Sequence, residues 1–212
     1  LQPRRGVDWA RRPLALPAAK AAPMREGAFV PQLAKLGDAP PAGEGWLHEI
    51  KWDGYRILAT ILGGEVRLWS RNALEWTDRI PEVRAALEAL GLESACLDGE
   101  LIAGRGRKED FNLLQATLSG ERQGALAYVM FDLLHLQGVD VSAAPLLERK
   151  ALLGALLEGV AAPLAMSTHV VGGGLDAFDA AAAQGFLCSA PAPRPRRPTP
   201  SCKTPPPVRT NR

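Results

Sequence analysis

The chain has 212 residues, of which 47% are hydrophobic and 23% are charged, and its formal net charge is +2. This length and composition allow one sizeable domain or two small ones with a packed core. The sequence contains no run of about 18 apolar residues, which excludes a membrane-spanning helix of ordinary length.

The basic charge is concentrated at one end of the chain. Residues 187–212 carry six basic residues and no acidic ones, which leaves 19 basic against 23 acidic residues, a net of −4, in residues 1–186. Any contact of this larger part with nucleic acid therefore needs a local basic patch. The cysteines are Cys96, Cys188 and Cys202, whose spacing matches no zinc site, so a reducing cytoplasm is expected. The N-terminus has no signal-peptide layout and no initiating Met, which suggests a piece of a longer chain.

The first predicted element is a linker. Residues 1–28 contain four prolines among arginines and alanines, and we expect a linker or a disordered arm there. The apolar segment Phe29–Ala34 begins the domain.

A strand that ends in a lysine follows. Residues 46–51 alternate between two faces, which is the period of a half-buried strand. Asp53-Gly54 predicts a tight turn, because glycine takes a positive φ without a Cβ clash, and Tyr55–Leu62 predicts the next strand. Lys51 is therefore expected at a strand end, with Arg56 just past the turn. A neighbouring cation or partial desolvation lowers the pKa of a lysine and makes it a nucleophile. The alternative is an ordinary strand-end lysine.

Glycine and proline mark the remaining elements. Gly63-Gly64 predicts a hairpin between Tyr55–Leu62 and Glu65–Ser70. Pro81 and Gly91 bound a helix over residues 81–90, whose buried stripe includes Val83, Leu87 and Leu90. Further strands are predicted over 94–102, 125–134 and 163–170, and further helices over 111–118, capped by Asp110, and over 146–157 and 175–184.

The order of these elements predicts the fold class. Hairpins and helices are mixed without strict βαβ alternation, so we expect an α+β domain of antiparallel sheets flanked by helices over residues 29–186. After Phe186 the composition changes, with eight prolines in the 26 residues of 187–212. We expect this Pro/Arg-rich tail to be disordered.

Four motifs in a fixed order carry a resemblance to a known family. They are Glu49–Arg56 around Lys51, Ser70-Arg71-Asn72, Leu97–Leu101 and Tyr128–Asp132. This set resembles the covalent nucleotidyltransferases, which comprise ATP-dependent DNA ligases, RNA ligases and mRNA capping enzymes. Leu47–Arg56 is most similar to the ligase domain of bacterial multi-domain end-joining ligases of the ligase D type. The resemblance covers about residues 29–186 and implies an ATP-grasp-like nucleotidyltransferase domain.

The resemblance implies a catalytic role for Lys51. Its amine would attack the α-phosphate of ATP, expel pyrophosphate and hold AMP as a phosphoramide. Arg56 would bring charge to the phosphate or ribose, and its alternative role is an exposed strand cation. Glu49 would line the adenine pocket, and its alternative is a solvated carboxylate. His48 receives no catalytic role.

Four further residues receive roles by the same resemblance. Arg71 would contact the ribose side of the nucleotide and the DNA end. Glu100, with Asp98 on the same strand face, would bind Mg²⁺ (or Mn²⁺) or the ribose hydroxyls, and Gly99 between them would allow close approach of a neighbouring backbone. The ring of Phe131 would stack on adenine, whereas an aromatic in such an apolar strand is otherwise part of the core.

The family pattern departs from this sequence after Phe186. Relatives have an acidic segment after the glycine–aromatic pair, then two lysines that contact phosphates and an OB-fold domain. Here Leu187-Cys188-Ser189 follows, and Lys203 is the one lysine of the tail. We therefore expect a C-terminally truncated domain that lacks the OB-fold domain and is impaired in full ligation. A truncation or a changed reading frame is our hypothesis for the origin of the tail.

The predicted function is that of an ATP-dependent DNA ligase adenylation domain, which joins 5′-phosphate and 3′-hydroxyl ends in DNA repair. The expected partners are ATP, nicked or broken duplex DNA and end-joining repair proteins, with no membrane and a cytoplasmic, nucleoid-associated location. One alternative is an RNA ligase or capping-type nucleotidyltransferase, and another is an inactive nucleotide-binding remnant. A third is an interaction protein whose tail arginines, Arg194, Arg196 and Arg197, bind phosphates in a salt-sensitive way.

Overall fold

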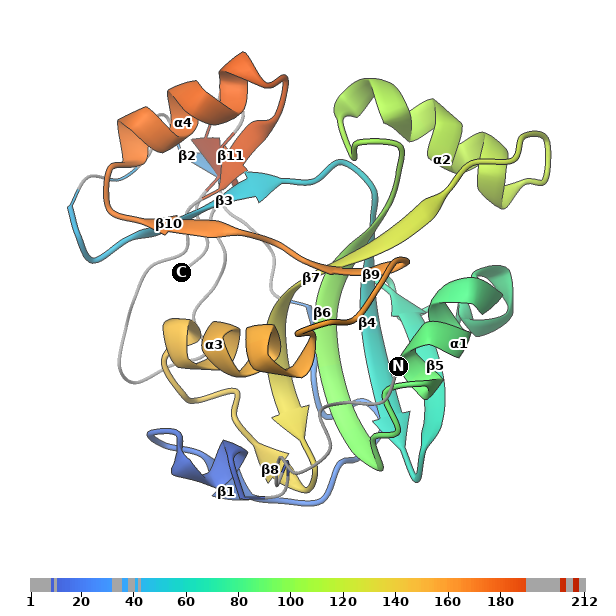
Figure 1. Ribbon diagram of the computed structural model, residues 1–212, viewed down its shortest axis with the longest axis vertical. Helices are drawn as coiled ribbons and strands as arrows, with labels where there is room; N and C mark the ends of the chain where they lie inside the picture. The colour runs from blue at the N-terminus through green and yellow to red at the C-terminus, as the bar shows by residue number, and fades with distance from the viewer. Residues whose placement is uncertain are drawn as a thin grey trace. The chain divides into compact units, whose positions relative to one another are not determined.

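The computed structural model describes most of the chain as two compact units. It describes residues 9, 11–31, 36–37, 41, 43–189, 203–204 and 208–209, with the backbone alone at 36–37, 187–189, 203–204 and 208–209. The first unit comprises residues 1–31 and 54–166, and the second comprises residues 32–53 and 167–212. Each unit has its own sheet (Figure 1), and each is described separately.

The first unit is built on a seven-stranded sheet. Its strands follow the order β1-β8-β7-β6-β4-β5, and β9 pairs with β7 off this path. The strands are β1 (Lys20–Ala21), β4 (Tyr55–Leu62), β5 (Glu65–Ser70), β6 (Ser94–Ala103), β7 (Leu126–Leu136), β8 (Val139–Asp140) and β9 (Leu164–Met166). Neighbours are antiparallel except β9, which lies parallel to β7, so the expectation of antiparallel sheets holds with this one exception.

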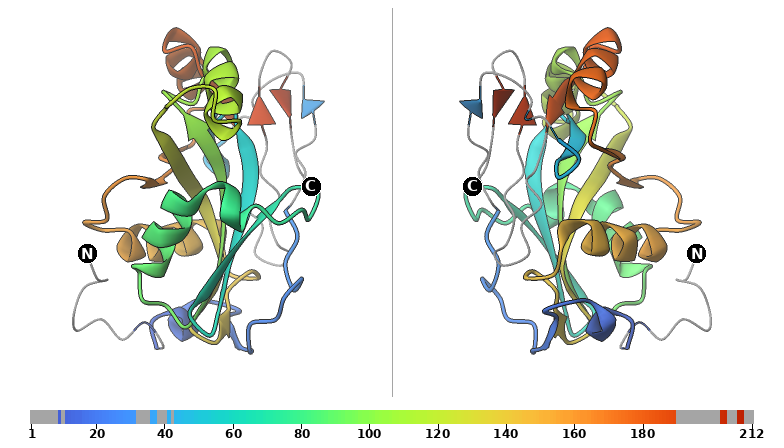
Figure 2. Two further views of the ribbon diagram at one scale, coloured as in Figure 1. Left: turned by 90° about the vertical axis from the view of Figure 1, so that its right-hand side faces the viewer. Right: turned by 90° about the vertical axis from the view of Figure 1, so that its left-hand side faces the viewer.

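The main core of this unit includes side chains of α1 (Pro81–Glu88), α2 (Phe111–Leu118) and α3 (Leu146–Leu156). The short 3-10 helices of the unit are η1 (Pro13–Ala15), η2 (Thr77–Arg79) and η3 (Lys108–Asp110). Ile57 and Ile61 of β4 are buried together with Val83 and Leu87 of α1. Figure 2 shows α1 and α3 on the same side of the sheet. Full burial of such side chains contributes about 1.5–3 kcal/mol each.

Local sequence rules account for most of these elements. β4 and β5 have the predicted bounds, and Gly63 and Gly64 between them have φ of +61° and +79°, as a type I′ hairpin turn requires. Helix α1 begins at Pro81, and Gly91 after it has φ of +64°. The predicted cap of α2 is wrong, because the Asp110 carboxylate instead accepts hydrogen bonds from the N–H groups of Arg105 and Arg107 in the preceding loop.

Gly54 is needed for a reason other than the predicted one. It does not have a positive φ, so it is not the turn glycine that the sequence indicated. A Cβ on Gly54 would instead lie 2.0 Å from the carbonyl oxygen of Leu101 on β6. The absence of a side chain therefore allows the start of β4 to approach β6. Gly99 confirms its predicted role in the same way, because a Cβ there would lie 2.7 Å from the carbonyl oxygen of Val129.

The second unit has a six-stranded antiparallel sheet. Its strands follow the order β10-β3-β11-β12-β13-β2. They are β2 (Leu36–Gly37), β3 (Leu47–Lys51), β10 (His169–Val171), β11 (Leu187–Ser189), β12 (Lys203–Thr204) and β13 (Val208–Arg209). Helix α4 (Gly174–Ala183) packs on β3 and β11. Within the described parts of the chain, no helix has the length and apolarity needed to cross a bilayer.

The predicted strand over residues 163–170 is divided between the two units. Its first half is β9, which pairs with β7, and its second half is β10, which pairs with β3. Ser167 between them is fully buried and accepts a hydrogen bond from the indole of Trp52. This contact joins residues that are distant in sequence, so no local sequence pattern predicts the interruption of the strand.

The part of the N-terminal arm that the structure describes is docked on the first unit, whereas the sequence indicated a linker or a disordered arm. β1 pairs with β8, and Trp9 and Met24 are buried. The carbonyl of Ala22 lies 2.9 Å from Nε2 of His135, and the ring of Phe29 lies 6.3 Å from the same imidazole. The part of the arm after β1 runs along the side of the sheet opposite to α1 and α3 (Figure 2), where Met24 and Phe29 cover apolar surface that would otherwise face water.

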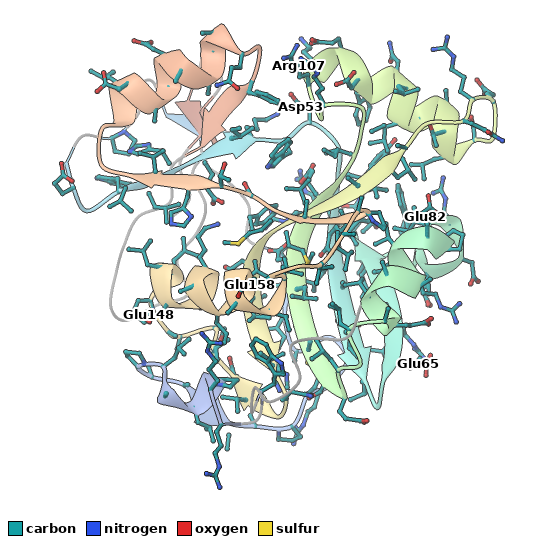
Figure 3. The ribbon with its side chains drawn as sticks, in the orientation of Figure 1. Asp53, Glu65, Glu82, Arg107, Glu148 and Glu158 are labelled. Atoms are coloured by element: carbon teal, nitrogen blue, oxygen red, sulfur yellow. The ribbon has the colours of Figure 1, made fainter. Side chains whose placement is uncertain are left out.

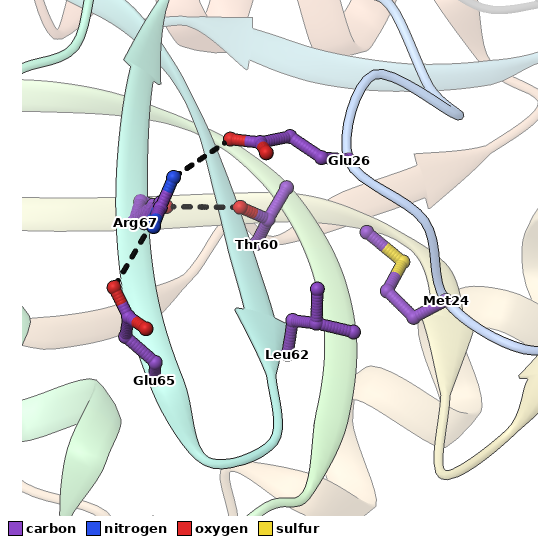
Figure 4. A pocket seen from close by; sticks show the side chains of 6 residues that line it. All are labelled: Met24, Glu26, Thr60, Leu62, Glu65 and Arg67. Carbon is purple, nitrogen blue, oxygen red and sulfur yellow. Dashed lines mark hydrogen bonds and ion pairs between the residues drawn. The ribbon is translucent and has the colours of Figure 1, made fainter.

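A pocket marks the place where the arm crosses the β4–β5 hairpin (Figure 4). It has a volume of about 70 Å³ and is lined by Met24, Glu26, Thr60, Leu62, Glu65 and Arg67. Arg67 forms ion pairs with Glu26 of the arm at 3.0 Å and with Glu65 at 3.1 Å. Such exposed pairs contribute little to stability, so the buried Met24 side chain is the stronger attachment of the arm.

The structured part of the second unit extends past the predicted boundary at Phe186. β11 pairs with β3, and its residues Leu187–Ser189 were expected to begin the disordered tail. The backbone N–H and C=O groups along the edge of β3 need hydrogen-bond partners, and any non-proline backbone can supply them. The Pro/Arg-rich composition of the tail therefore does not prevent Leu187–Ser189 from pairing there. β12 and β13 continue the sheet. The other tail residues, and with them the expected disorder, lie outside the described residues.

We predict that Met24→Ala lowers the free energy of unfolding by about 2–3 kcal/mol, because it removes a buried side chain and leaves a cavity under the arm. Leu14→Ala on the same arm is the matched control, since Leu14 is 50% exposed, and it should change stability by less than about 0.5 kcal/mol. Urea unfolding of both variants measures the difference. Equal stabilities would show that the arm does not dock on the sheet.

Candidate active site

Lys51 occupies the last position of β3, as predicted. β3 has a strand on each side, with Lys51 opposite Leu187 of β11 and Glu49 opposite His169 of β10. The backbone that carries Lys51 is therefore held from both edges. Its ammonium forms an ion pair with Asp53, which lies two residues further along the chain and is labelled in Figure 3. The sequence indicated Asp53 only as part of a turn, so its contact with Lys51 is an addition to the predicted site.

Trp52 anchors the residue next to Lys51. Its indole N–H donates to the hydroxyl of Ser167 at 3.0 Å, and its ring meets Phe186 edge-on, with centroids 5.5 Å apart and planes at 68°. An edge-on aromatic pair of this kind contributes about 0.5–1.5 kcal/mol beyond the area that it buries. Trp52 thus links β3 to residues far along the chain and restricts the backbone next to Lys51. Sequence reasoning missed this role of Trp52 and Ser167.

The two residues before Ile50 on β3 are both buried. Glu49 is 6% exposed, which contradicts the alternative of a solvated carboxylate. His48 is 2% exposed, and neither of its ring nitrogens has a hydrogen-bond partner within the described residues. A Cβ on Gly174, the first residue of α4, would lie 2.7 Å from Cε1 of His48, so the helix start packs directly on the imidazole. Burial lowers the pKa of His48 below its ordinary value of 6.5.

A second group of predicted residues meets on the sheet of the first unit. Arg56 on β4 donates to both carboxylate oxygens of Asp98 on β6, from Nε at 2.5 Å and from Nη2 at 2.6 Å. Its guanidinium carbon lies 4.4 Å from the ring centroid of Phe131 on β7. Arg56 is thus not the exposed strand cation of the alternative. The Arg56 guanidinium covers one face of the Phe131 ring, so an adenine base would stack on the other face.

Neighbouring carboxylates stabilise the positive charge of the Arg56 guanidinium in this buried place. Burial by itself lowers the pKa of Arg56, but attraction to Asp98, the hydrogen bonds to Asp98 and the nearby charge of Glu100 outweigh it and raise the pKa. Glu100 is 5% exposed and lies opposite Arg56 in the β4–β6 register. Both acids are therefore buried rather than part of the charged surface. The three side chains form one buried charge cluster on neighbouring strands.

A metal site fits these residues only in part. The described residues contain no group of three or more His, Cys, Asp or Glu side chains arranged to hold a metal ion. Both oxygens of Asp98 already accept hydrogen bonds from Arg56. Mg²⁺ commonly takes one or two carboxylates and completes its coordination with phosphates and water, so Glu100 as a single carboxylate is compatible with a metal that arrives with a nucleotide.

Arg71 is not part of the buried charge cluster. It is exposed in the turn after β5, at the same end of the hairpin as Arg56, because Ser70 lies opposite Ile57 in the register. The turn is closed by a hydrogen bond from the N–H of Ala73 to the carbonyl of Ser70 at 2.9 Å. An exposed cation in this place is available to a ligand that has yet to bind.

Two further buried groups of the first unit, Cys96 and Arg149, received no site role from the sequence. Cys96 is fully buried, and its burial, followed by the charges of Asp98, Asp132 and Asp140, raises the pKa of its thiol, which makes it unreactive. Arg149 of α3 is 1% exposed and forms an ion pair with Asp132 at 2.7 Å. An arginine in an amphipathic helix is ordinarily on the solvated face, so the sequence offered no indication of this burial.

The comparisons with known proteins agree with this architecture. The model of the ATP dependent DNA ligase domain matches residues 31–185, and the chain belongs to this family. It is 42% identical over 165 residues to the multifunctional non-homologous end joining protein LigD of Pseudomonas aeruginosa, a match that covers 75% of this chain and 19% of that protein. It is 34% identical over 148 residues to DNA ligase C of Mycobacterium tuberculosis, with 66% and 41% covered. The chain thus spans less than half of either relative.

Solved structures show the same fold. The ligase domain of LigD from M. tuberculosis aligns with a TM-score of 0.70 and 25% identity over 85% of this chain and 61% of that one. A mycobacterial DNA ligase D complexed with ATP and MES aligns with the same TM-score and identity over 84% and 61%. The predicted α+β nucleotidyltransferase fold and the predicted resemblance to DNA ligases of the ligase D type are confirmed.

We predict that Asp98→Ala lowers the free energy of unfolding by about 3–5 kcal/mol, because it leaves the buried Arg56 charge without its partner. Adding Arg56→Met should recover part of this loss, since no buried charge then remains. The control is Asp78→Ala, which removes an exposed acid 3.6 Å from Arg84 and should cost less than about 1 kcal/mol. Urea unfolding tests the series, and a double variant less stable than Asp98→Ala would contradict the prediction.

We also predict a pH dependence of stability from His48. Its folded pKa is lower than the unfolded value of 6.5, so the unfolded chain binds the proton first as the pH falls. His48 therefore lowers the free energy of unfolding as the pH falls from about 6.5 to the folded pKa of His48. Below the folded pKa both states are protonated, and this contribution no longer changes with pH. His48→Leu should remove this part of the pH dependence, whereas His169→Gln should retain it. Melting temperatures measured from pH 8 to pH 5 compare the variants, and an unchanged pH profile in His48→Leu would exclude His48.

Proposed function

We propose that this chain carries out lysine adenylylation in an ATP-dependent DNA ligase and that Lys51 is the nucleophile. The observation that carries the proposal is the position of Lys51 in a member of this family: it lies at the end of a strand paired on both sides and forms an ion pair with Asp53. The matching family model is the ATP dependent DNA ligase domain, and one relative is named DNA ligase C, which supports this function over an RNA ligase or a capping enzyme.

In the proposed reaction, Nζ of Lys51 attacks the α-phosphorus of ATP. A P–N bond forms, the bond to the bridging oxygen breaks, and pyrophosphate leaves with the electron pair. The attacking amine must be neutral and ends as a phosphoramide, so two protons leave it in all. Asp53 is placed to fix the amine and to receive one of these protons. The anchored Trp52 limits the positions that the amine takes, and positioning is the main requirement of phosphoryl transfer.

The remaining predicted residues receive roles in nucleotide binding under this proposal. Phe131 stacks on the adenine, Arg56 presents its charge to the ribose or phosphates, and Glu49 contributes to the adenine pocket. Arg71 contacts the nucleotide and the DNA end. We reassign Asp98 from metal ligand to partner of Arg56, because its oxygens are occupied by that guanidinium. Glu100 would hold Mg²⁺ or Mn²⁺, whose charge would neutralise the phosphates when bound.

We further propose that the substrate of the whole protein is nicked or broken duplex DNA and that its process is end joining. The support is the 42% identity to a relative whose name includes non-homologous end joining. End-joining repair proteins would then be partners, and the location would be cytoplasmic and nucleoid-associated. The net charge of −4 in residues 1–186 gives no general attraction to DNA. Binding of DNA therefore depends on local cations such as Arg71.

Incubation with ATP labelled at the α-phosphate, in Mg²⁺, tests the proposed nucleophile. The wild-type chain should become covalently labelled, and acid treatment should release the label, since a phosphoramide is acid-labile. Lys51→Ala should show no label, because alanine has no amine, and Lys51→Arg should also fail, because guanidinium stays protonated.

Lys108→Ala is the matched control, since Lys108 is exposed and should be dispensable for labelling. Label retained on Lys51→Ala would remove Lys51 from the mechanism. A wild-type chain that binds ATP and takes up no label would favour the alternative of an inactive nucleotide-binding remnant.

A further inference from the structure

The strand that carries Phe131 is irregular at this residue. Along β6 and β7, Asp98 pairs with Asp132 and Gly99 pairs with Met130, so Phe131 is an extra residue with no partner on β6. This is a β-bulge, which bends a strand locally and changes the direction of a side chain. The direction of the Phe131 ring is therefore set by the bulge rather than by the regular alternation of β7.

The bulge is held by a buried arginine from another element. Arg149 of α3 donates to both carboxylate oxygens of Asp132, from Nε at 2.7 Å and from Nη2 at 2.8 Å. Oδ1 of Asp132 also accepts the backbone N–H of Leu133 at 2.8 Å. The carboxylate thus connects the backbone just past the bulge to the guanidinium of Arg149.

Arg149 is itself fixed by the loop before its helix. Its Nη1 donates to the carbonyl of Ala144 at 2.5 Å and to that of Ser142 at 3.2 Å. The side chain is 1% exposed, and a planar guanidinium with four such bonds has a single orientation. A lysine has one ammonium group and cannot span the same set of acceptors. A rigid clamp therefore runs from the β8–α3 loop to the bulge beside Phe131.

We propose, on the basis of the function proposed above, that Arg149 is a positioning residue for ATP. It acts through Asp132 and the bulge to direct the Phe131 ring toward the adenine. Arg56 lies over the same ring from β4 and is fixed by Asp98, the residue opposite Asp132. Two buried Arg–Asp pairs thus flank Phe131, one at its ring and one at its backbone. Arg149 does not touch the nucleotide in this role.

The test is a double-mutant cycle on ATP affinity. The four proteins are the wild-type chain, Arg149→Lys, Phe131→Leu and the double variant, with ATP dissociation constants measured by calorimetry at low temperature. A misdirected ring loses part of its stacking on the base, so Arg149→Lys should weaken ATP binding about five- to tenfold. In the Phe131→Leu background, Arg149→Lys should have no further effect, because no aromatic ring remains to direct.

The control separates positioning from stability. Leu153→Ala removes a fully buried side chain from the same helix and should lower the melting temperature without changing the ATP dissociation constant of the folded protein. If Arg149→Lys does not fold, Asp132→Asn takes its place in the cycle, since it removes the charge of the clamp and keeps an oxygen acceptor.

Three results would overturn the positioning role. They are unchanged ATP affinity in Arg149→Lys, an equal loss of affinity with and without the Phe131 ring, and an equal loss of affinity in Leu153→Ala. A wild-type chain that binds no ATP would overturn the proposed function together with this role, whereas normal wild-type binding with one of these three results overturns this role alone.

Discussion

The ion pair of Arg56 with Asp98 is the interaction on which the candidate nucleotide-binding residues of the first unit depend. The side chains of Arg56 and Asp98, on neighbouring strands, are only 11% and 6% exposed, and each charge would be costly there without the other. With Asp98 engaged, the guanidinium lies over the Phe131 ring and within range of the Glu100 charge. One bidentate contact thus fixes a cation, occupies a carboxylate and covers one face of an aromatic ring, which restricts how a nucleotide can bind.

Lys51 is positioned by different means in the second unit. A reactive lysine needs a fixed backbone and a mobile amine. The strand pairs on both sides of β3 and the Trp52–Ser167 hydrogen bond fix the backbone, while the amine forms an ion pair with Asp53, whose side chain is 20% exposed. A partly exposed ion pair is weak enough to break when a substrate phosphate approaches. Rigid support next to a releasable contact suits a residue that must form and lose a covalent bond.

Sequence patterns predicted the local elements well, because their causes are local. The Gly63-Gly64 turn, the start of α1 at Pro81 and the alternation of β4 each depend on residues within one element. The ordered motifs predicted the family and placed Lys51, Arg56, Glu100 and Phe131 in strands. Sequence patterns predicted one strand over residues 163–170, but contacts with distant residues divide it. Its first half pairs with β7, its second half pairs with β3, and Ser167 between them binds Trp52.

The sequence by itself determined the family, the α+β class, the strand-end position of Lys51 and the need for a small residue at Gly99. The tertiary structure alone decided that Gly54 serves close approach to Leu101, that the described part of the arm is docked, that Asp98 binds Arg56 and that Arg149 is buried against Asp132. The physical reason is that a charged side chain takes the partner that lies nearest in space. That partner here is up to 42 residues away along the chain, beyond the reach of any local pattern.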